Sequence, residues 1–515
     1  MRSSVRSLAA AILIGGTTVV AFFSGGFFDR PRLIAGLAAW ALVIAAALVG
    51  TRPLPSSTAG RIALAGLFGL TAWTALSMAW APLGGRAQDD LQRLLLYLGF
   101  FVASLALLRG VGVRRWLEPS LVLSALVIVG YALSERLLPG LIELDRSQSA
   151  SGRLEQPITY WNALGAIAAI GVVLAVRVAG DPERSKAMRG AAAAAGVPLC
   201  LGVYLSFSRG ALAAVAAGLL VLLALAPAGR PQLRSALMIL VTGAAAALVA
   251  SRLPTLESLQ SGESGVPAEG LVMLGCLVVL AGAAAALVTR TPRREARHFP
   301  LPVSRRAAVM TVTVVALLVA VVGAATLEGK PEGVSPDPEA RAARLGSIDT
   351  NRYRYWDVAI QGWAEKPIWG LGSGAFFVEW RRTGDRVDQS ADAHSLYLET
   401  AAELGLIGVA LLALLFGGVT AALVRLDRVH PRTATGLAAG LAAWAVHAGL
   451  DWDWEVPAVS LVALLLAAAA IAWSEELPVR RPATAAAGHT EGRRSTDGAG
   501  QPGPSPGSRS ASTVG

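Results

Sequence analysis

Four short polar clusters of this sequence contain side chains that could take part in group transfer, and the first is Ser206–Gly210. It separates two apolar runs and contains Arg209. A guanidinium keeps its charge near neutral pH and can bind a phosphate through two hydrogen bonds. Arg209 could therefore bind a phosphorylated substrate. The alternative is a plain connector between spans, whose arginine extends to the membrane interface.

The second cluster combines arginines, aromatic residues and glycines. It runs from Asn351 to Trp356 and continues into a Gly-x-Gly-x-Gly segment around Gly372. On a helix, Arg352 and Trp356 share one face because they are four residues apart. The glycines permit tight turns and close approach of the backbone to a ligand, but no strand–helix unit surrounds them, which argues against a dinucleotide fold. An interfacial aromatic helix with a glycine turn is the alternative.

The third cluster is Asp392–Ser395, followed by acidic residues that include Glu403. His394 opens a predicted amphipathic helix that runs into the next span. Histidine is the most common general base because it can accept a proton near pH 7. A lone histidine can equally be structural. An Asp-x-His metal pair would need more histidine or cysteine ligands than the sequence offers.

The fourth cluster follows His447 and runs from Asp451 to Glu455, with three acids alternating with tryptophans. An Asp-x-Asp pair can hold a metal bound to a sugar-nucleotide diphosphate. The simpler interpretation, which we favour from the sequence, is an interfacial tryptophan belt with acids outside the membrane.

The elements that would position these clusters are membrane spans. The 515 residues are 54% apolar and only 16% charged, against about 25% charge in soluble domains. The apolar residues form repeated runs, and about 20 such residues cross a bilayer core as a helix. We predict an all-α polytopic membrane protein with about fourteen transmembrane helices, at 8–28, 33–50, 61–80, 91–108, 117–133, 160–179, 191–206, 211–227, 235–251, 271–289, 307–327, 395–424 (including its first turn), 435–450 and 457–473.

The loop charges predict the orientation of the chain. The net charge is +10, and the arginines gather in alternate connections, whereas the other short loops are acidic. This pattern indicates that the basic excess reflects membrane topology and not nucleic-acid binding. By the positive-inside rule it predicts both termini in the cytoplasm. The two cysteines, Cys200 and Cys276, lie in apolar runs, which excludes a disulfide framework or a CxxC site.

The chain divides into three predicted regions. Residues 1–150 form N-terminal transmembrane helices, and residues 151–473 form a core that includes one long outer loop, 328–393. A loop of that length between spans is usually functional or disordered. Residues 474–515, rich in Gly, Pro, Ser and Thr, are expected to form a disordered cytoplasmic tail.

In this order, the clusters resemble motifs of the O-antigen ligase family, which includes O-antigen polymerases and some protein O-oligosaccharyltransferases. The resemblance covers about residues 150–470. The matching segments are Ser206–Gly210, Arg352-x3-Trp356, Pro367-x2-Gly-x-Gly, and His394-Ser395 with the following Gly405-x2-Gly408, and Arg153–Gly165 resembles the family's upstream polar segment.

The resemblance implies a membrane-embedded glycosyltransferase of the bacterial inner membrane. Its donor would be a glycan on undecaprenyl diphosphate, and its acceptor a lipid, glycan or protein. Arg209 and Arg352 would hold the diphosphate leaving group, while His394 would deprotonate the acceptor hydroxyl, with inversion at the anomeric carbon. No metal or other cofactor is implied, because the arginines neutralise the charge. The candidate substrate-binding residues are Arg354, Ser395, Glu403, Gly372 and Asp451.

Two other classes of function stay open from the residues alone. A multi-span transporter of an envelope precursor would suit the number of spans, although transporter sites usually lie near the bilayer midplane between internal repeats. A structural subunit that recruits other envelope enzymes is the third reading. Within the transferase class, ligase and polymerase are not separated.

Overall fold

The computed structural model describes residues 2–48, 51, 53–227, 229–290, 352–383 and 390–476. Within these ranges the chain forms helices and no β-strand, which confirms the predicted all-α class. Three predicted features lie outside the described residues: the span 307–327, the loop 328–393 up to residue 351 together with 384–389, and the tail from residue 477 onward.

Ten described helices are long and apolar enough to cross a membrane. They are α2 (Asp29–Leu48), α3 (Thr58–Ser77), α4 (Gly84–Leu107), α5 (Val111–Leu137), α6 (Trp161–Ala179), α7 (Lys186–Leu205), α9 (Gly229–Ala250), α11 (Pro267–Thr289), α16 (Leu396–Asp427) and α18 (Pro457–Glu475). Three more predicted spans coincide with helices outside that set, α1 (Arg2–Ala21), α8 (Arg209–Leu225) and α17 (Pro431–Ala448). The polytopic membrane class is confirmed, whereas the count of fourteen is not.

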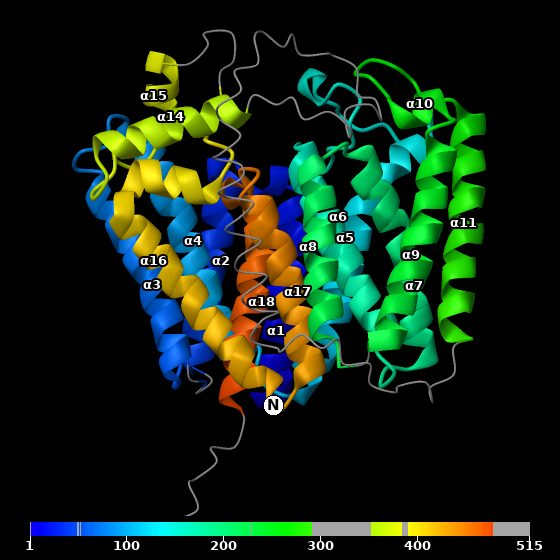
Figure 1. The fold of residues 1–515 in the computed structure, drawn as a ribbon, viewed down its shortest axis with the longest axis horizontal. Helices are drawn as coiled ribbons and strands as arrows, with labels where there is room; N and C mark the ends of the chain where they lie inside the picture. Colours follow the sequence, from blue (N-terminus) through cyan, green and yellow to red (C-terminus); the bar gives the residue numbers. More distant parts are fainter. Residues whose placement is uncertain are drawn as a thin grey trace, which may run out of the picture. The chain divides into compact units, whose positions relative to one another are not determined.

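The helices of residues 2–476 pack side by side, so their ends gather at two faces (Figure 1). Two short helices, α14 (Arg352–Glu365) and α15 (Phe376–Thr383), lie at one of these faces, which we term the α14 face. The helices α4, α6, α8, α16 and α18 begin there, whereas α5, α7, α9 and α17 end there (Figure 1).

Burial separates central helices from peripheral ones. The most apolar stretches of α6 and α18 are completely buried, whereas those of α2 and α11 are only 17% and 22% buried. Exposed apolar side chains over such lengths are typical of helices that face lipid. The center of the bundle is therefore protein-lined, and the periphery suits hydrocarbon.

Glycines allow the closest helix contacts, as expected where lipid removes the hydrophobic drive between helices. A Cβ built on Gly66 of α3 would lie 2.5 Å from Leu415 N of α16. In return, a Cβ on Gly418 of α16 would lie 2.5 Å from Ala59 O of α3. The backbones of these two helices are thus in contact, which fixes α16 against α3.

Candidate functional site

The segment Pro367–Gly372 is bound to α16 where that helix is interrupted. The interruption is at Gly405, whose φ is 65° and ψ −165°. Across it, Leu406 N donates to Pro367 O at 2.8 Å, and Gly372 N donates to Glu403 O at 2.9 Å. A Cβ on Gly405 would lie 2.3 Å from a carbonyl oxygen of the segment. Only glycine fits both this contact and the positive φ.

The side chain of Glu403 holds the continuation of the same segment. Its carboxylate accepts hydrogen bonds from Gly374 N at 2.9 Å and Phe376 N at 3.0 Å. Gly372 has φ 102°, and a Cβ there would lie 2.6 Å from the Cα of Ala81. The contacts of these two candidate substrate-binding residues, Glu403 and Gly372, therefore fix the backbone between α14 and α15.

His394 lies just before α16 in a strained conformation. Its φ is 53°, which is uncommon for a residue with a side chain. Its Nδ1 lies 3.0 Å from the backbone oxygen of Asp392. Because a carbonyl oxygen only accepts, Nδ1 donates this hydrogen bond, and in the neutral imidazole Nε2 is then the nitrogen that can accept. The rings of Tyr355 and Trp452 flank the imidazole, with centroids 5.0 and 5.9 Å away. Ser395, the next residue, is buried.

Arg352 is the first residue of α14 and forms an ion pair with Asp451. The Asp451 carboxylate is fully buried and also accepts a hydrogen bond from Tyr160 Oη at 2.6 Å. The side-chain amide of Asn162 donates to that hydroxyl at 2.8 Å. Burial alone would raise the pKa of Asp451, but the guanidinium and two nearby histidines outweigh burial and hold this pKa below its usual value. Arg354, two residues further along, is exposed.

Arg209 begins α8, directly after the helix-capping residue Ser208. The next residue, Gly210, lies against the imidazole of His447, because a Cβ built on this glycine would lie 3.1 Å from Nε2. His447 is completely buried, and its Nδ1 lies 2.5 Å from Oδ2 of Asp453. The first turn of α8 is thereby in contact with the end of α17.

Three consecutive residues after α17 connect these parts, and we term them the acidic turn (Asp451–Asp453). Asp451 pairs with Arg352. Trp452 lies beside the ring of His394. Asp453 binds His447, which contacts the turn that carries Arg209. The structure thus brings the surroundings of all three predicted catalytic residues to one turn at the α14 face.

The burial of the acidic turn corrects the interpretation favoured from the sequence. Both aspartates are 0% exposed, so neither is a solvated acid beside a tryptophan belt. The reason is that each carboxylate has a partner from a distant part of the chain, Arg352 for Asp451 and His447 for Asp453.

A cavity of about 40 Å³ lies between α3, α4, the start of α16 and the residues Trp454 and Glu455. It is lined by four acids and one arginine, Asp90, Glu399, Glu403, Glu455 and Arg93. Burial raises the pKa of Glu455, and the neighbouring acids add to this rise against the opposing effect of Arg93. With one arginine among these residues, the cavity lacks the excess of cations that would favour an anionic substrate. Among the described residues, no group of three or more His, Cys, Asp or Glu is arranged to hold a metal ion.

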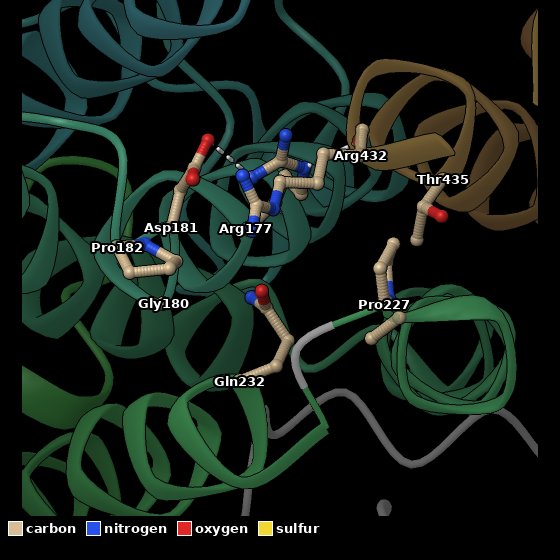
Figure 2. Close-up of a pocket in the computed structure, with 9 residues that line it drawn as sticks. Arg177, Gly180, Asp181, Pro182, Pro227, Gln232, Arg432 and Thr435 are labelled. Atoms are coloured by element: carbon tan, nitrogen blue, oxygen red, sulfur yellow. Dashed lines mark hydrogen bonds and ion pairs between the residues drawn. The ribbon is translucent and has the colours of Figure 1, made fainter. Parts of the chain in front are cut away.

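A smaller cavity lies at the opposite end of the helices, between α6, α8, α9 and α17 (Figure 2). Its volume of about 10 Å³ suits about one water molecule. Arg177 pairs there with Asp181 at 3.0 Å and with Glu118 at 3.5 Å, and donates from Nε to Arg432 O at 2.9 Å. These bonds tie α5, α6 and α17 together, so the basic residues of this cavity are explained by packing.

One family model matches part of the chain. Residues 270–413 match the family model described as O-Antigen ligase. The matched range includes Arg352, His394 and Glu403, whereas Arg209 and the acidic turn lie outside it, before and after. No curated protein matches the chain.

Proposed function

From the match of residues 270–413 to the O-antigen ligase family model, we propose that this membrane protein transfers a glycan from an undecaprenyl-diphosphate carrier to a hydroxyl group of an acceptor. The family indicates a glycosyltransferase-like enzyme of cell-envelope biosynthesis that acts on lipid-linked glycans. In our proposal the α14 face lies on the outer side of the bacterial inner membrane and both termini lie in the cytoplasm. The acceptor is a lipid, a glycan or a protein.

The observation that carries this proposal is the acidic turn, because it joins a candidate base to two candidate phosphate-binding arginines. A diphosphate leaving group needs cations, and a hydroxyl nucleophile needs a base within about 3 Å. His394, Arg352 and Arg209 come from three segments, and each segment contacts this turn either directly or through His447. The cluster therefore supplies the groups that the reaction requires.

His394 acts as the general base in the proposed reaction. The hydrogen bond from Nδ1 to Asp392 O leaves Nε2 as the accepting nitrogen. Nε2 takes the proton of the acceptor hydroxyl while its oxygen attacks the anomeric carbon. The bond from that carbon to the diphosphate breaks, its electron pair leaves with the diphosphate, and the configuration inverts. The imidazolium then releases the proton to water.

Arg352 and Arg209 stabilise the departing diphosphate. Asp451 orients the guanidinium of Arg352 before substrate arrives, so little reorganisation is needed as charge develops. Arg209 adds a second cation at the first turn of α8, where the backbone N–H groups also favour an anion. Two guanidinium groups thus do the charge neutralisation, without a metal ion. Arg354 and Ser395 are further candidate substrate contacts.

The test is glycan transfer by purified protein in proteoliposomes that contain a lipid-linked glycan donor and an acceptor. Arg352→Ala and His394→Ala are expected to lower the transfer rate by about 100-fold or more with normal membrane insertion. Matched controls are Arg382→Ala, an exposed arginine of α15, and His430→Ala, which precedes α17 at the opposite end. Wild-type rates in either site variant would remove that residue from the mechanism.

A further inference from the structure

A buried imidazole–carboxylate pair lies beside the proposed reacting groups and has no part in the reaction described above. His447 and Asp453 are both 0% exposed, and Nδ1 of the one lies 2.5 Å from Oδ2 of the other. Ser460 Oγ donates to the backbone oxygen of Asp453 at 2.8 Å, which fixes the turn beneath the pair. Burying two ionisable groups carries a desolvation cost, so packing alone does not account for the choice of residues.

The far edge of this imidazole meets the backbone of α8. Nε2 of His447 is buried and has no hydrogen-bond partner among the described residues. A Cβ built on Gly210 would lie 3.1 Å from this nitrogen and 3.2 Å from Cδ2. Such contacts are tighter than ordinary van der Waals separations, so any side chain at this position would push against the ring. The ring therefore limits how closely the first turn of α8 can approach α17.

The pair also links the two arginines. Arg352 is anchored on Asp451, which is two residues before Asp453. Arg209 is the residue before Gly210, and Gly210 rests on the imidazole that Asp453 orients. One short turn thus sets the position of both guanidinium-bearing segments. A misplacement of about 1 Å between reacting groups can lower a rate by about 100-fold.

We propose that His447 and Asp453 are positioning residues. They hold the first turn of α8, which carries Arg209, at a fixed position relative to Arg352. This inference rests on the proposed transferase function. Asp453 fixes the orientation of the ring through Nδ1, as carboxylates commonly do for functional imidazoles. The opposite edge of the ring then fixes Gly210. Neither residue touches the substrate.

The test is a double-mutant cycle between the two sides of this contact, read as kcat for glycan transfer. Gly210→Ala adds a methyl group against the ring and is expected to lower kcat about 10- to 100-fold. His447→Asn keeps an N–H donor for Asp453 but removes the edge of the ring that faces Gly210. The combined variant is expected to regain at least about 10-fold in kcat over Gly210→Ala, because the methyl group fills the vacated space.

A matched control comes from the same helix. A Cβ on Gly218 of α8 would lie 2.6 Å from Val173 Cγ2, so Gly218→Ala is expected to lower the unfolding temperature. Because this contact does not involve the imidazole, His447→Asn is not expected to rescue that variant. Rescue restricted to Gly210→Ala would show that the coupling runs through the ring and is not a general relaxation of α8.

Additive effects in the Gly210→Ala/His447→Asn cycle, or wild-type kcat in Gly210→Ala, would overturn the inference. Should Gly210→Ala fail to insert, Asp453→Asn decides. It is expected to lower kcat at least about 10-fold with an unchanged KM for the donor, and an unchanged kcat would overturn the proposal. Transfer assays of wild type, Arg209→Ala and Arg352→Ala distinguish failure of the proposed function from failure of the positioning role. Absence of transfer by the wild-type protein would contradict the transferase function itself, and wild-type transfer in both variants would contradict the role of the arginines. Loss in both variants with an additive cycle would contradict only the positioning role.

Discussion

Asp451 combines two contacts in one buried carboxylate. It balances the charge of Arg352 and accepts a hydrogen bond from the hydroxyl of Tyr160. Removing one partner of a buried pair leaves the other uncompensated, which costs more than the pair itself contributes. This carboxylate therefore stabilises the α14 face and also orients the guanidinium that we assign to the diphosphate.

Replacing Asp451 by Asn is expected to lower both activity and stability. The neutral amide no longer balances Arg352, so we expect the transfer rate to fall at least about 10-fold and the free energy of unfolding to fall by about 1–3 kcal/mol. Transfer assays and thermal unfolding in detergent measure the two effects. Asp357→Asn is the control. This aspartate of α14 is exposed and is bonded only to Gln361 among the contacts that the structure describes. Equal behaviour of the two variants would contradict the assigned role.

The low pKa of Asp451 fixes the sign of its pH effect. Arg352 and the nearby histidines hold the folded-state pKa below the usual value despite burial, so at acid pH the unfolded chain binds the proton more tightly. The stabilisation is complete above the usual carboxyl pKa of about 4 and is lost as the pH falls through the lowered value. The difference in unfolding temperature between wild type and Asp451→Asn should therefore shrink as the pH is lowered below about 4. A difference that widens on acidification would contradict the ion pair.

At this scale the sequence revealed which groups are costly but not which groups meet. Arg209, Arg352 and His394 stand out because charged or titratable side chains next to apolar runs need a reason. The partnership of Asp451 with Arg352 joins residues 99 positions apart, and no local pattern encodes it. Tyr160 lies within Arg153–Gly165, which the sequence marks only by a resemblance, although its hydroxyl binds the Asp451 carboxylate.

Among the elements, the interrupted helix α16 decides how the site is assembled. Its break at Gly405 lets the segment Pro367–Gly372 pair with the helix backbone. The segment in turn connects α14, which carries Arg352, to α15. A continuous helix would not offer these backbone groups, because they would be bonded within the helix.

Gly405→Ala is expected to destabilise the fold by more than about 2 kcal/mol, because a side chain there combines a strained φ with a backbone clash. Gly417→Ala in the same helix is the control, since nothing lies within 4 Å of a Cβ built there. This control is expected to be neutral or stabilising by about 0.5–1 kcal/mol. Thermal unfolding of the two variants makes the comparison, and equal unfolding temperatures would count against the packing described for the break.

The helices were largely predictable, because apolar runs of membrane length leave few alternatives. On a helix, the four-residue spacing of Arg352 and Trp356 places both on one face, and the structure contains such a helix, α14. The break in α16 was not predicted. An apolar run around Gly405 reads as one continuous span, and only the pairing with a distant glycine segment shows why the helix is interrupted.

For the whole molecule, the remaining prediction is the side of the membrane on which the α14 face lies. Arg-rich alternate loops predict that this face is outside. We expect Arg382→Cys to react with a membrane-impermeant thiol reagent in intact cells, and Lys186→Cys to react only after permeabilisation. Both positions are exposed, and they lie at opposite ends of the helices. The background replaces Cys200 and Cys276 by alanine, and the reverse labelling pattern would contradict the orientation.

The most direct measurement is transfer of a lipid-linked glycan by purified His394→Ala with and without added imidazole, followed as release of undecaprenyl diphosphate. We expect the variant to lose about 100-fold or more of its rate. Imidazole should restore part of that rate, and more as neutral imidazole increases with pH. Wild-type release by His394→Ala without imidazole would contradict the claim that this side chain is the base of a glycan transfer at the acidic turn.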